Sequence, residues 1–385
     1  MESNTPPFTF EVGSFYDYLQ RMKDARKRRG IRYELPVILL FVILAKLCGE
    51  DTPFGVADWV KNRSEWLRTV LSLTYSRLPH HSTYRRIMET HEEELDRVTT
   101  NFLARLSEKK PYEIVVIDGK TLRGTLTPED PFGVHVLTAF LPEVGIALKQ
   151  LPVEKEKENE IVVAPKLLAG LNLQGKIVLG DAMQTQRALS SQIVDANGHF
   201  IWIVKDNQKL TRQAIELLFA PEKPKPGQGC PPLNFQTAKT FDAHHGRSEK
   251  RTITVSSMLN DYLDWPSVQQ VFKLDRHFTH STTGKVHQES QYGMTSLMPN
   301  QANPEKMLEL VRAEWGIENK LHFRRDVTFQ EDKTRMTLKP IARAMAIINN
   351  LVIALFNKQG FSNHAQARRI FCAKPSSALA LICRL

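Results

Sequence analysis

Three acidic residues could bind metal ions together, although they lie far apart in the sequence. Asp118 follows the apolar run at 114–117, Asp181 follows a second apolar run at 176–179, and Glu318 lies in a late segment with helical periodicity. Carboxylates that converge can bind two hard divalent cations roughly 4 Å apart. Such a pair of ions activates a water or a 3′-hydroxyl on one side of a phosphodiester and stabilises the leaving oxygen on the other. The three residues therefore predict metal-dependent phosphoryl transfer.

The pattern of apolar residues indicates which elements position these acids. The run at 114–117 is continuous and β-branched, which is typical of a strand buried on both faces. Further strands are predicted at 134–140, 146–153, 176–179 and 200–204, and helices at 159–171, 184–196 and 210–219. If the first and fourth strands are parallel neighbours, Asp118 and Asp181 end them at the same sheet edge, about 4.8 Å apart in backbone position. Glu318 must then approach from outside the sheet.

The order of these elements predicts the fold class. Three successive strands followed by alternating helices and strands is the order of an α/β RNase H-like mixed sheet, whereas an ordinary doubly wound sheet does not open with three strands. Residues 221–300 are predicted to form a β-rich insertion, because a Pro/Gly/Lys loop precedes strand-like runs at 251–255, 268–273 and 291–297. Helices follow at 304–325 and 339–357. We predict a helical N-terminal domain at 1–109 and a catalytic domain at 110–385.

Charge and composition favour an anionic partner. The chain of 385 residues has a formal net charge of +10, and its hydrophobic content of 42% excludes a disordered protein. The basic helical part at 319–385 contains twelve Lys and Arg residues against three acids, so the rest of the chain carries about +1. This excess begins directly after Glu318, where a DNA backbone would be held. A solvated basic face has the same composition.

The N-terminal region offers two further candidates for binding DNA. Ser82 is a plausible N-cap of a helix that carries Arg85 and Arg86 in its first turns, which resembles a helix-turn-helix recognition element, although many helical hairpins look the same. Seven basic residues at 21–32 could hold phosphates or form a solvated helix face.

No membrane span or metal-binding cysteine motif is predicted. The apolar run at 35–44 is shorter than the ~20 residues that a span needs, so we expect a buried helix. The four cysteines lack the spacing of a zinc site, and a reduced, cytoplasmic protein is predicted.

Side chains near the three acids suggest contacts with DNA. At 100° per residue, Glu314, Glu318, His322 and Arg325 share one face of the late helix, and Arg325 would clamp the scissile phosphate. Further contacts, with loop stabilisation as the alternative, are predicted at Lys120, Arg123, Lys205 and Asn207.

Nine sequence blocks carry a resemblance to a known family. They are LCGED (47–51), HSTYRR (81–86), IDGKTLRG (117–124), EKENEI (156–161), DAM (181–183), VKDNQ (204–208), HGR (245–247), WGIENKLH (315–322) and DVTFQED (326–332). In these blocks the chain resembles the DDE-type insertion-sequence transposases of the ISAs kind, which include the H-repeat-associated proteins.

The resemblance implies a catalytic triad of Asp118, Asp181 and Glu318, two Mg²⁺ ions for which Mn²⁺ substitutes, cleavage at the terminal inverted repeats of an element, and strand transfer into target DNA. It also implies a homo-oligomer on DNA in the nucleoid of a prokaryote. Related transposases carry a Tyr, Arg, Glu and Lys signature on the last helix; of these, Glu318 and a basic residue at Arg325 are retained, while Val311 and Glu314 replace the others. A nuclease that cuts without joining, and an inactive or domesticated DNA-binding protein, are the alternatives.

Overall fold

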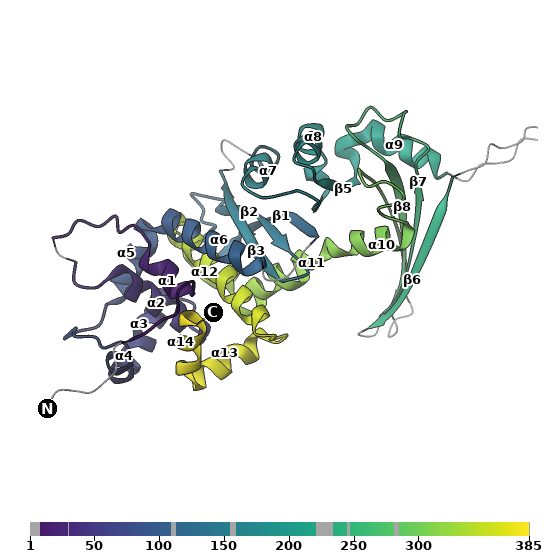
Figure 1. Ribbon diagram of the computed structural model, residues 1–385. Coiled ribbons are helices and arrows are strands. Elements are labelled where there is room, and N and C mark those ends of the chain that lie inside the picture. The colour runs from purple at the N-terminus through teal and green to yellow at the C-terminus, as the bar shows by residue number, and fades with distance from the viewer. Residues whose placement is uncertain are drawn as a thin grey trace, which may run out of the picture.

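A computed structural model describes residues 8–29, 31–108, 113–154, 159–220, 234–244, 247–280 and 285–384. Helices from the N-terminal third lie at one end, a mixed sheet lies in the middle, and long strands of the same sheet form the other end (Figure 1). Parts of the EKENEI block, the HGR block and the predicted insertion, together with Cys230, lie outside the described residues.

The N-terminal region is helical, as predicted. Its helices are α1 (Phe15–Gln20), α2 (Leu35–Leu47), α3 (Pro53–Asn62), α4 (Ser64–Val70), α5 (His81–Thr90) and α6 (Glu92–Glu108). Helix α2 is the apolar run recognised in the sequence. It begins with Pro36 in its first turn, is almost wholly buried, and is followed by Gly49 at a φ of 113°, a backbone conformation that favours glycine.

One mixed sheet contains all nine strands of the described residues, in the order β3-β2-β1-β4-β5-β9-β8-β7-β6. The strands are β1 (Ile114–Leu122), β2 (Val134–Leu141), β3 (Ile146–Val153), β4 (Ile177–Gly180), β5 (His199–Val204), β6 (Gln236–His244), β7 (Arg247–Ser256), β8 (Gln270–His280) and β9 (Val286–Thr295). Strands β1, β4 and β5 are parallel, and β1 pairs antiparallel with β2. This is the RNase H-like arrangement that the element order predicts.

Two details of the sheet differ from the sequence prediction. Strand β1 does not end before Asp118, because residues 118–122 continue the antiparallel ladder with β2. The β-rich insertion extends the core sheet, because β9 pairs antiparallel with β5. Strand β6, whose side chains alternate weakly between apolar and polar, was not predicted.

Helices cover both faces of the sheet. One face is packed by α7 (Glu160–Ala169), α8 (Arg187–Asp195) and α9 (Lys209–Leu218). The other is packed by α6 and by α12 (Lys339–Lys358), and here the N-terminal helices and the sheet share one hydrophobic core. Helix α12 is long and apolar enough to cross a membrane, but 83% of its apolar window is buried inside the protein, as in a core helix.

The late helix predicted at 304–325 is not one regular α-helix. It consists of α10 (Pro304–Ala313) and α11 (Trp315–Ile317), followed by two π-helical turns, η4 (Glu318–His322) and η5 (Arg324–Thr328). A π turn holds more residues than an α turn, so the 100° periodicity fails beyond Glu318. The chain ends with α13 (His364–Ala373) and α14 (Pro375–Cys383).

Candidate active site

The register of two parallel strands brings Asp118 and Asp181 to the same sheet edge. Ile117 pairs with Gly180, and β4 ends there, so Asp118 keeps a strand neighbour only on the β2 side. Asp181 then caps a short helical turn, with its Oδ1 accepting a hydrogen bond from the Met183 backbone N–H at 2.9 Å. The expected parallel neighbours are therefore present, although Asp118 lies within its strand.

Glu318 reaches the same edge from the first π turn. His322 Nδ1 lies 3.3 Å from Glu318 Oε2 and 3.5 Å from Asp118 Oδ2. One ligand atom from each of Asp118, Glu318 and His322 lies within 4.8 Å of those of the other two. Asp181 is outside that close set, but it lines the same cleft of about 230 Å³ as Asp118 and Glu318.

The cleft brings several acidic side chains close together where they are partly buried. The pKa of Asp118 is raised to about 7, chiefly by burial and also by the carboxylates of Asp181, Glu160 and Glu318, while a hydrogen bond from the Gly119 N–H opposes the shift. The pKa of Glu314 is also raised to about 7, chiefly by burial and to a smaller extent by Asp181 and Asp118. Burial is again the main cause that raises the pKa of Asp181. Because neighbouring carboxylates disfavour one another's ionisation, this site favours a bound cation.

Glu318 behaves differently from the other acids. A hydrogen bond from His322 lowers its pKa, and the nearby Lys120 acts in the same direction. Burial in turn lowers the pKa of His322, and the nearby Arg325 and Lys120 add to this effect. The imidazole is therefore neutral near pH 7 and bridges two carboxylates.

The sequence assigned no role to Glu160, which lies near enough to Asp118 and Asp181 to raise the pKa of both. Asn159 caps α7, and Glu160 is held by His135 Nε2 and by Gln184 Nε2, each at 2.8 Å. A Cβ at Gly119 would collide with the carboxylate of Glu160. The glycine after Asp118 is therefore explained by this close approach and not by a turn. The EKENEI block was the signal that could have pointed to Glu160.

Three residues predicted to contact DNA are buried. Arg325 is 0% exposed and its Nε donates to Glu331 Oε2 at 2.8 Å. Lys120 is buried with its Nζ 2.6 Å from Asp326 Oδ1, and His322 is enclosed between the two carboxylates. The prediction that Arg325 clamps a phosphate is wrong, because the π turn directs this side chain into the protein.

The other predicted contacts are exposed. Lys205 lines the acidic cleft, Arg123 lies beyond the end of β1, and Asn207 donates a hydrogen bond to the Ala182 carbonyl. Arg85 and Arg86 are exposed on α5, in the N-terminal region. Of these five residues, Lys205 alone lines the cleft that holds the three acids.

A mixed sheet whose edge carries two aspartates, with a glutamate supplied by a late helical segment, defines the DDE class of transposase, as the sequence blocks had indicated. A family model described as "Transposase DDE domain" matches residues 109–355, and one described as "DDE_Tnp_1-associated" matches residues 16–103. The chain belongs to the Transposase DDE domain family.

Bacterial relatives span nearly the whole chain. YncI of Escherichia coli O157:H7, whose name marks it as a transposase by inference only, is 26% identical over 353 residues, 89% of this chain and 87% of its own. YhhI of E. coli K12, named as H repeat-associated, is 24% identical over 357 residues, 89% of this chain and 90% of its own. A solved structure, the piggyBac transposase synaptic complex with hairpin DNA, has a TM-score of 0.44 and 12% identity, covering 96% of this chain and 77% of that one.

Proposed function

We propose that the protein is a DNA transposase that cleaves phosphodiester bonds at the ends of an insertion sequence and joins those ends to target DNA. One observation carries this proposal: Asp118, Asp181 and Glu318, from β1, the end of β4 and η4, line one cleft. Burial, together with the neighbouring carboxylates, raises the pKa of Asp118, and this gathering of acids in one cleft supports a role in binding cations.

The donor set fits Mg²⁺ or Mn²⁺. Asp118, Asp181 and Glu318 offer carboxylate oxygens, the ligands that these hard ions prefer. Bound there, two such ions would supply the charge that activates an attacking hydroxyl and stabilises the leaving oxygen. His322 is a nitrogen donor and suits hard ions less well, so we assign it the role of holding the Glu318 carboxylate beside Asp118.

The surrounding residues would prepare the cleft for a phosphate. Lys205 is an exposed cation on its wall and would attract the scissile phosphate. Glu160, fixed by His135 and Gln184, would add a further negative charge beside the two aspartates and so favour the binding of cations. Lys120 is held by Asp326, and its positive charge would reduce the repulsion among the acids.

We assign DNA binding to the helical region at 1–109, and chemistry to 110–385 with its insertion at about 221–300 and its basic part at 319–385. The partners would be the terminal inverted repeats and target DNA in the bacterial nucleoid. Because two ends must be paired before joining, a homo-oligomer on DNA is expected.

The test is a cleavage and joining assay on labelled element ends with Mg²⁺ or Mn²⁺. Asp118→Asn removes a ligand worth several kcal/mol, so both products should fall by at least about a thousand-fold. The control is Asp264→Asn, because Asp264 is 96% exposed and lies outside the cleft.

Each outcome separates the candidate functions. Retained cleavage in Asp118→Asn would refute the assigned site. Cutting without joining by the unaltered protein would identify a nuclease. A shift of labelled DNA without cutting would identify a DNA-binding protein that lacks catalysis.

A further inference from the structure

The helical N-terminal region contains a cleft of about 1410 Å³ that is lined by basic residues. Its walls come from residues 26–29 and 31–33, from α3 and α4, from the loop at 76–80 and from α5. Eight Lys and Arg residues and two histidines line it, against one acid, Asp58. None of these residues lines the cleft that holds Asp118.

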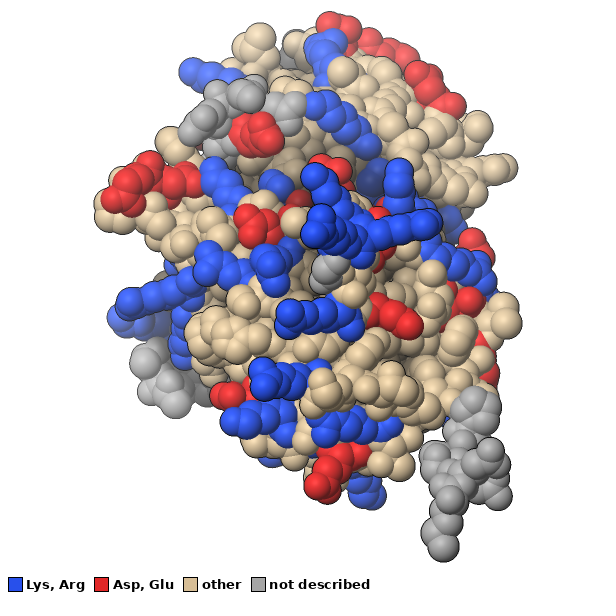
Figure 2. Space-filling view, turned by 90° about the vertical axis from the view of Figure 1, so that its left-hand side faces the viewer, with Lys and Arg blue, Asp and Glu red and all other residues tan. Residues whose placement is uncertain are grey.

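Most of these cations are free to bind an anion. The exposed cations of the cleft for which the described part of the chain provides no ion pair are Lys27, Arg29, Arg32, Lys61, Arg77 and Arg86. The helices that carry the cleft face the viewer in Figure 2, and Lys and Arg predominate over the middle of that face. Six unpaired cations around one concave surface repel one another, so a polyanion would be bound with a gain in free energy.

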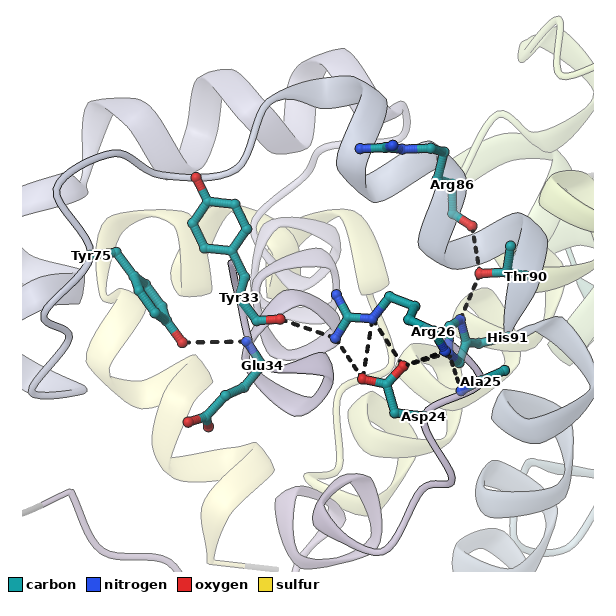
Figure 3. Close-up of polar contacts among 9 residues, drawn as sticks. All are labelled: Asp24, Ala25, Arg26, Tyr33, Glu34, Tyr75, Arg86, Thr90 and His91. Carbon is teal, nitrogen blue, oxygen red and sulfur yellow. Dashed lines mark hydrogen bonds and ion pairs between the residues drawn. The ribbon is translucent and has the colours of Figure 1, made fainter. Parts of the chain in front are cut away.

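The arginine-rich segment is held in place at both ends. Asp24 receives hydrogen bonds from the backbone and guanidinium of Arg26, and His91 Nε2 lies 3.2 Å from both Asp24 Oδ1 and the Ala25 backbone N (Figure 3). At the other end, Arg26 donates a hydrogen bond to the Tyr33 carbonyl, and the Glu34 N–H donates one to the Tyr75 hydroxyl. These anchors lie on either side of Lys27, Arg29 and Arg32, so the described residues that carry the three cations are held near the cleft before a ligand binds.

An aromatic surface adjoins the cations. Phe54, 62% exposed, stacks on His81 with the ring centroids 3.8 Å apart, and His80 lies against His81 at 3.9 Å. All three residues line the cleft. An exposed apolar face between cations suits the sugar of a nucleic acid better than a simple inorganic anion.

We propose that this cleft binds the sugar-phosphate backbone of duplex DNA and holds the duplex away from the acidic site. The identity of the DNA rests on the proposed function. Recognition is chiefly through phosphates, so sequence preference is weak. The geometry also revises the helix-turn-helix interpretation: Arg86 lines the cleft, whereas Arg85 does not.

The first experiment measures binding of the full chain to a labelled duplex as a function of salt, without divalent cations so that no cleavage occurs. Six phosphate contacts give a slope of log K against log salt of about −5. The triple variant Arg29→Ala, Lys61→Ala and Arg77→Ala should bind at least about tenfold more weakly and lose about three units of slope.

The matched control neutralises Lys209, Lys239 and Lys250, exposed cations on α9, β6 and β7 at the opposite end of the molecule (Figure 1). Equal affinity and slope for the cleft variant and the unaltered protein would overturn the proposal, and so would a larger loss in the control. Equal affinity for a single strand of the same length would overturn the assignment to duplex DNA. Normal binding with no cleavage in any condition would overturn the proposed function and leave the cleft assignment standing.

A second variant tests whether the anchored segment matters beyond its charge. Asp24→Ala removes a negative charge beside the cleft, so simple electrostatics predicts tighter binding. Loss of the contacts to Arg26 and His91 frees the segment, and ordering it on binding then predicts severalfold weaker binding. We expect weaker binding, and tighter binding would show that the segment is not pre-organised.

Discussion

Two regions of this protein are rich in basic residues, and they differ in how many of their cations bind within the protein. Half of the twelve Lys and Arg residues at 319–385 do so, whereas six of the eight that line the N-terminal cleft are exposed and have no ion pair among the described residues. In the part at 319–385, Arg325 pairs with Glu331, Arg343 with Glu92 and Arg368 with Asp51, while Lys320 and Arg324 donate to backbone carbonyls. In the N-terminal cleft, six cations have no such partner among the described residues. A local excess of Lys and Arg therefore does not by itself identify a surface that binds DNA.

The contacts of the C-terminal cations explain this difference. Asp51 lies in the helical region and also accepts a hydrogen bond from the buried Lys46, so Arg368 joins the C-terminal helices to the N-terminal ones. Arg368 also donates to the Thr328 carbonyl at the end of the second π turn. These cations fix the segment that carries Glu318 in place, whereas the N-terminal cations are left for a ligand.

The largest effect that would sharpen this comparison is expected from Arg325→Met. The substitution leaves the carboxylate of Glu331 buried without its partner, which costs about 3–5 kcal/mol of unfolding free energy. Urea unfolding measures this loss, and Arg325→Met with Glu331→Met should recover part of it. The exposed Arg369→Met is the control. If Arg325→Met left stability unchanged but weakened DNA binding, Arg325 would contact a phosphate after all, as the sequence suggested.

An intermediate effect is expected from His322→Ala. Without its contact to the imidazole, the Glu318 carboxylate, whose side chain is 60% exposed, is no longer held beside Asp118. Loss of a group that orients a metal ligand typically costs about 10–100-fold in activity or metal affinity. The Mg²⁺ concentration for half-maximal cleavage should rise, while DNA binding at the N-terminal cleft stays unchanged. Phe323→Ala, an exposed neighbour, is the control, and equal Mg²⁺ requirements in all three proteins would exclude the assigned role.

The smallest effect concerns pH. Because the folded pKa of Asp118 is raised to about 7 from its ordinary value of 3.8, the folded state binds more protons than the unfolded state between these values. The stability of the metal-free protein should therefore fall as pH rises through that window, and Glu314 contributes with the same sign. Near pH 8, Asp118→Asn should raise Tm by about 1–3 °C.

Mg²⁺ supplies the comparison for this measurement. Added Mg²⁺ should stabilise the unaltered protein more near pH 8 than near pH 5, because protons and the cation compete for the same carboxylates. Thermal unfolding at both pH values checks the sign. If, without metal near pH 8, Asp118→Asn were less stable than the unaltered protein, the like charges in the cleft would not destabilise the fold.

Local pattern was enough to predict the strands that bring Asp118 beside Asp181. A β-branched run such as 114–117 is buried on both faces only in the middle of a sheet, and the element order then limits which strands are neighbours. The position of Glu318 followed from the WGIENKLH block. The length of β1 was not predicted, because an Asp-Gly pair is typical of a turn. Only the structure shows that Gly119 is a glycine because the Glu160 carboxylate packs against it.

By itself, the sequence determined most of the secondary structure, the family and the three acids that line one cleft, because strand alternation, helix caps and motif blocks are properties of neighbouring residues. Only the tertiary structure decided which cations are available. The pairing of Arg368 with Asp51 joins residues 317 positions apart, and the basic cleft combines side chains from 26 to 90. Such contacts depend on how the elements pack. The π turn, for example, buries Arg325, so this residue pairs with Glu331 instead of facing DNA.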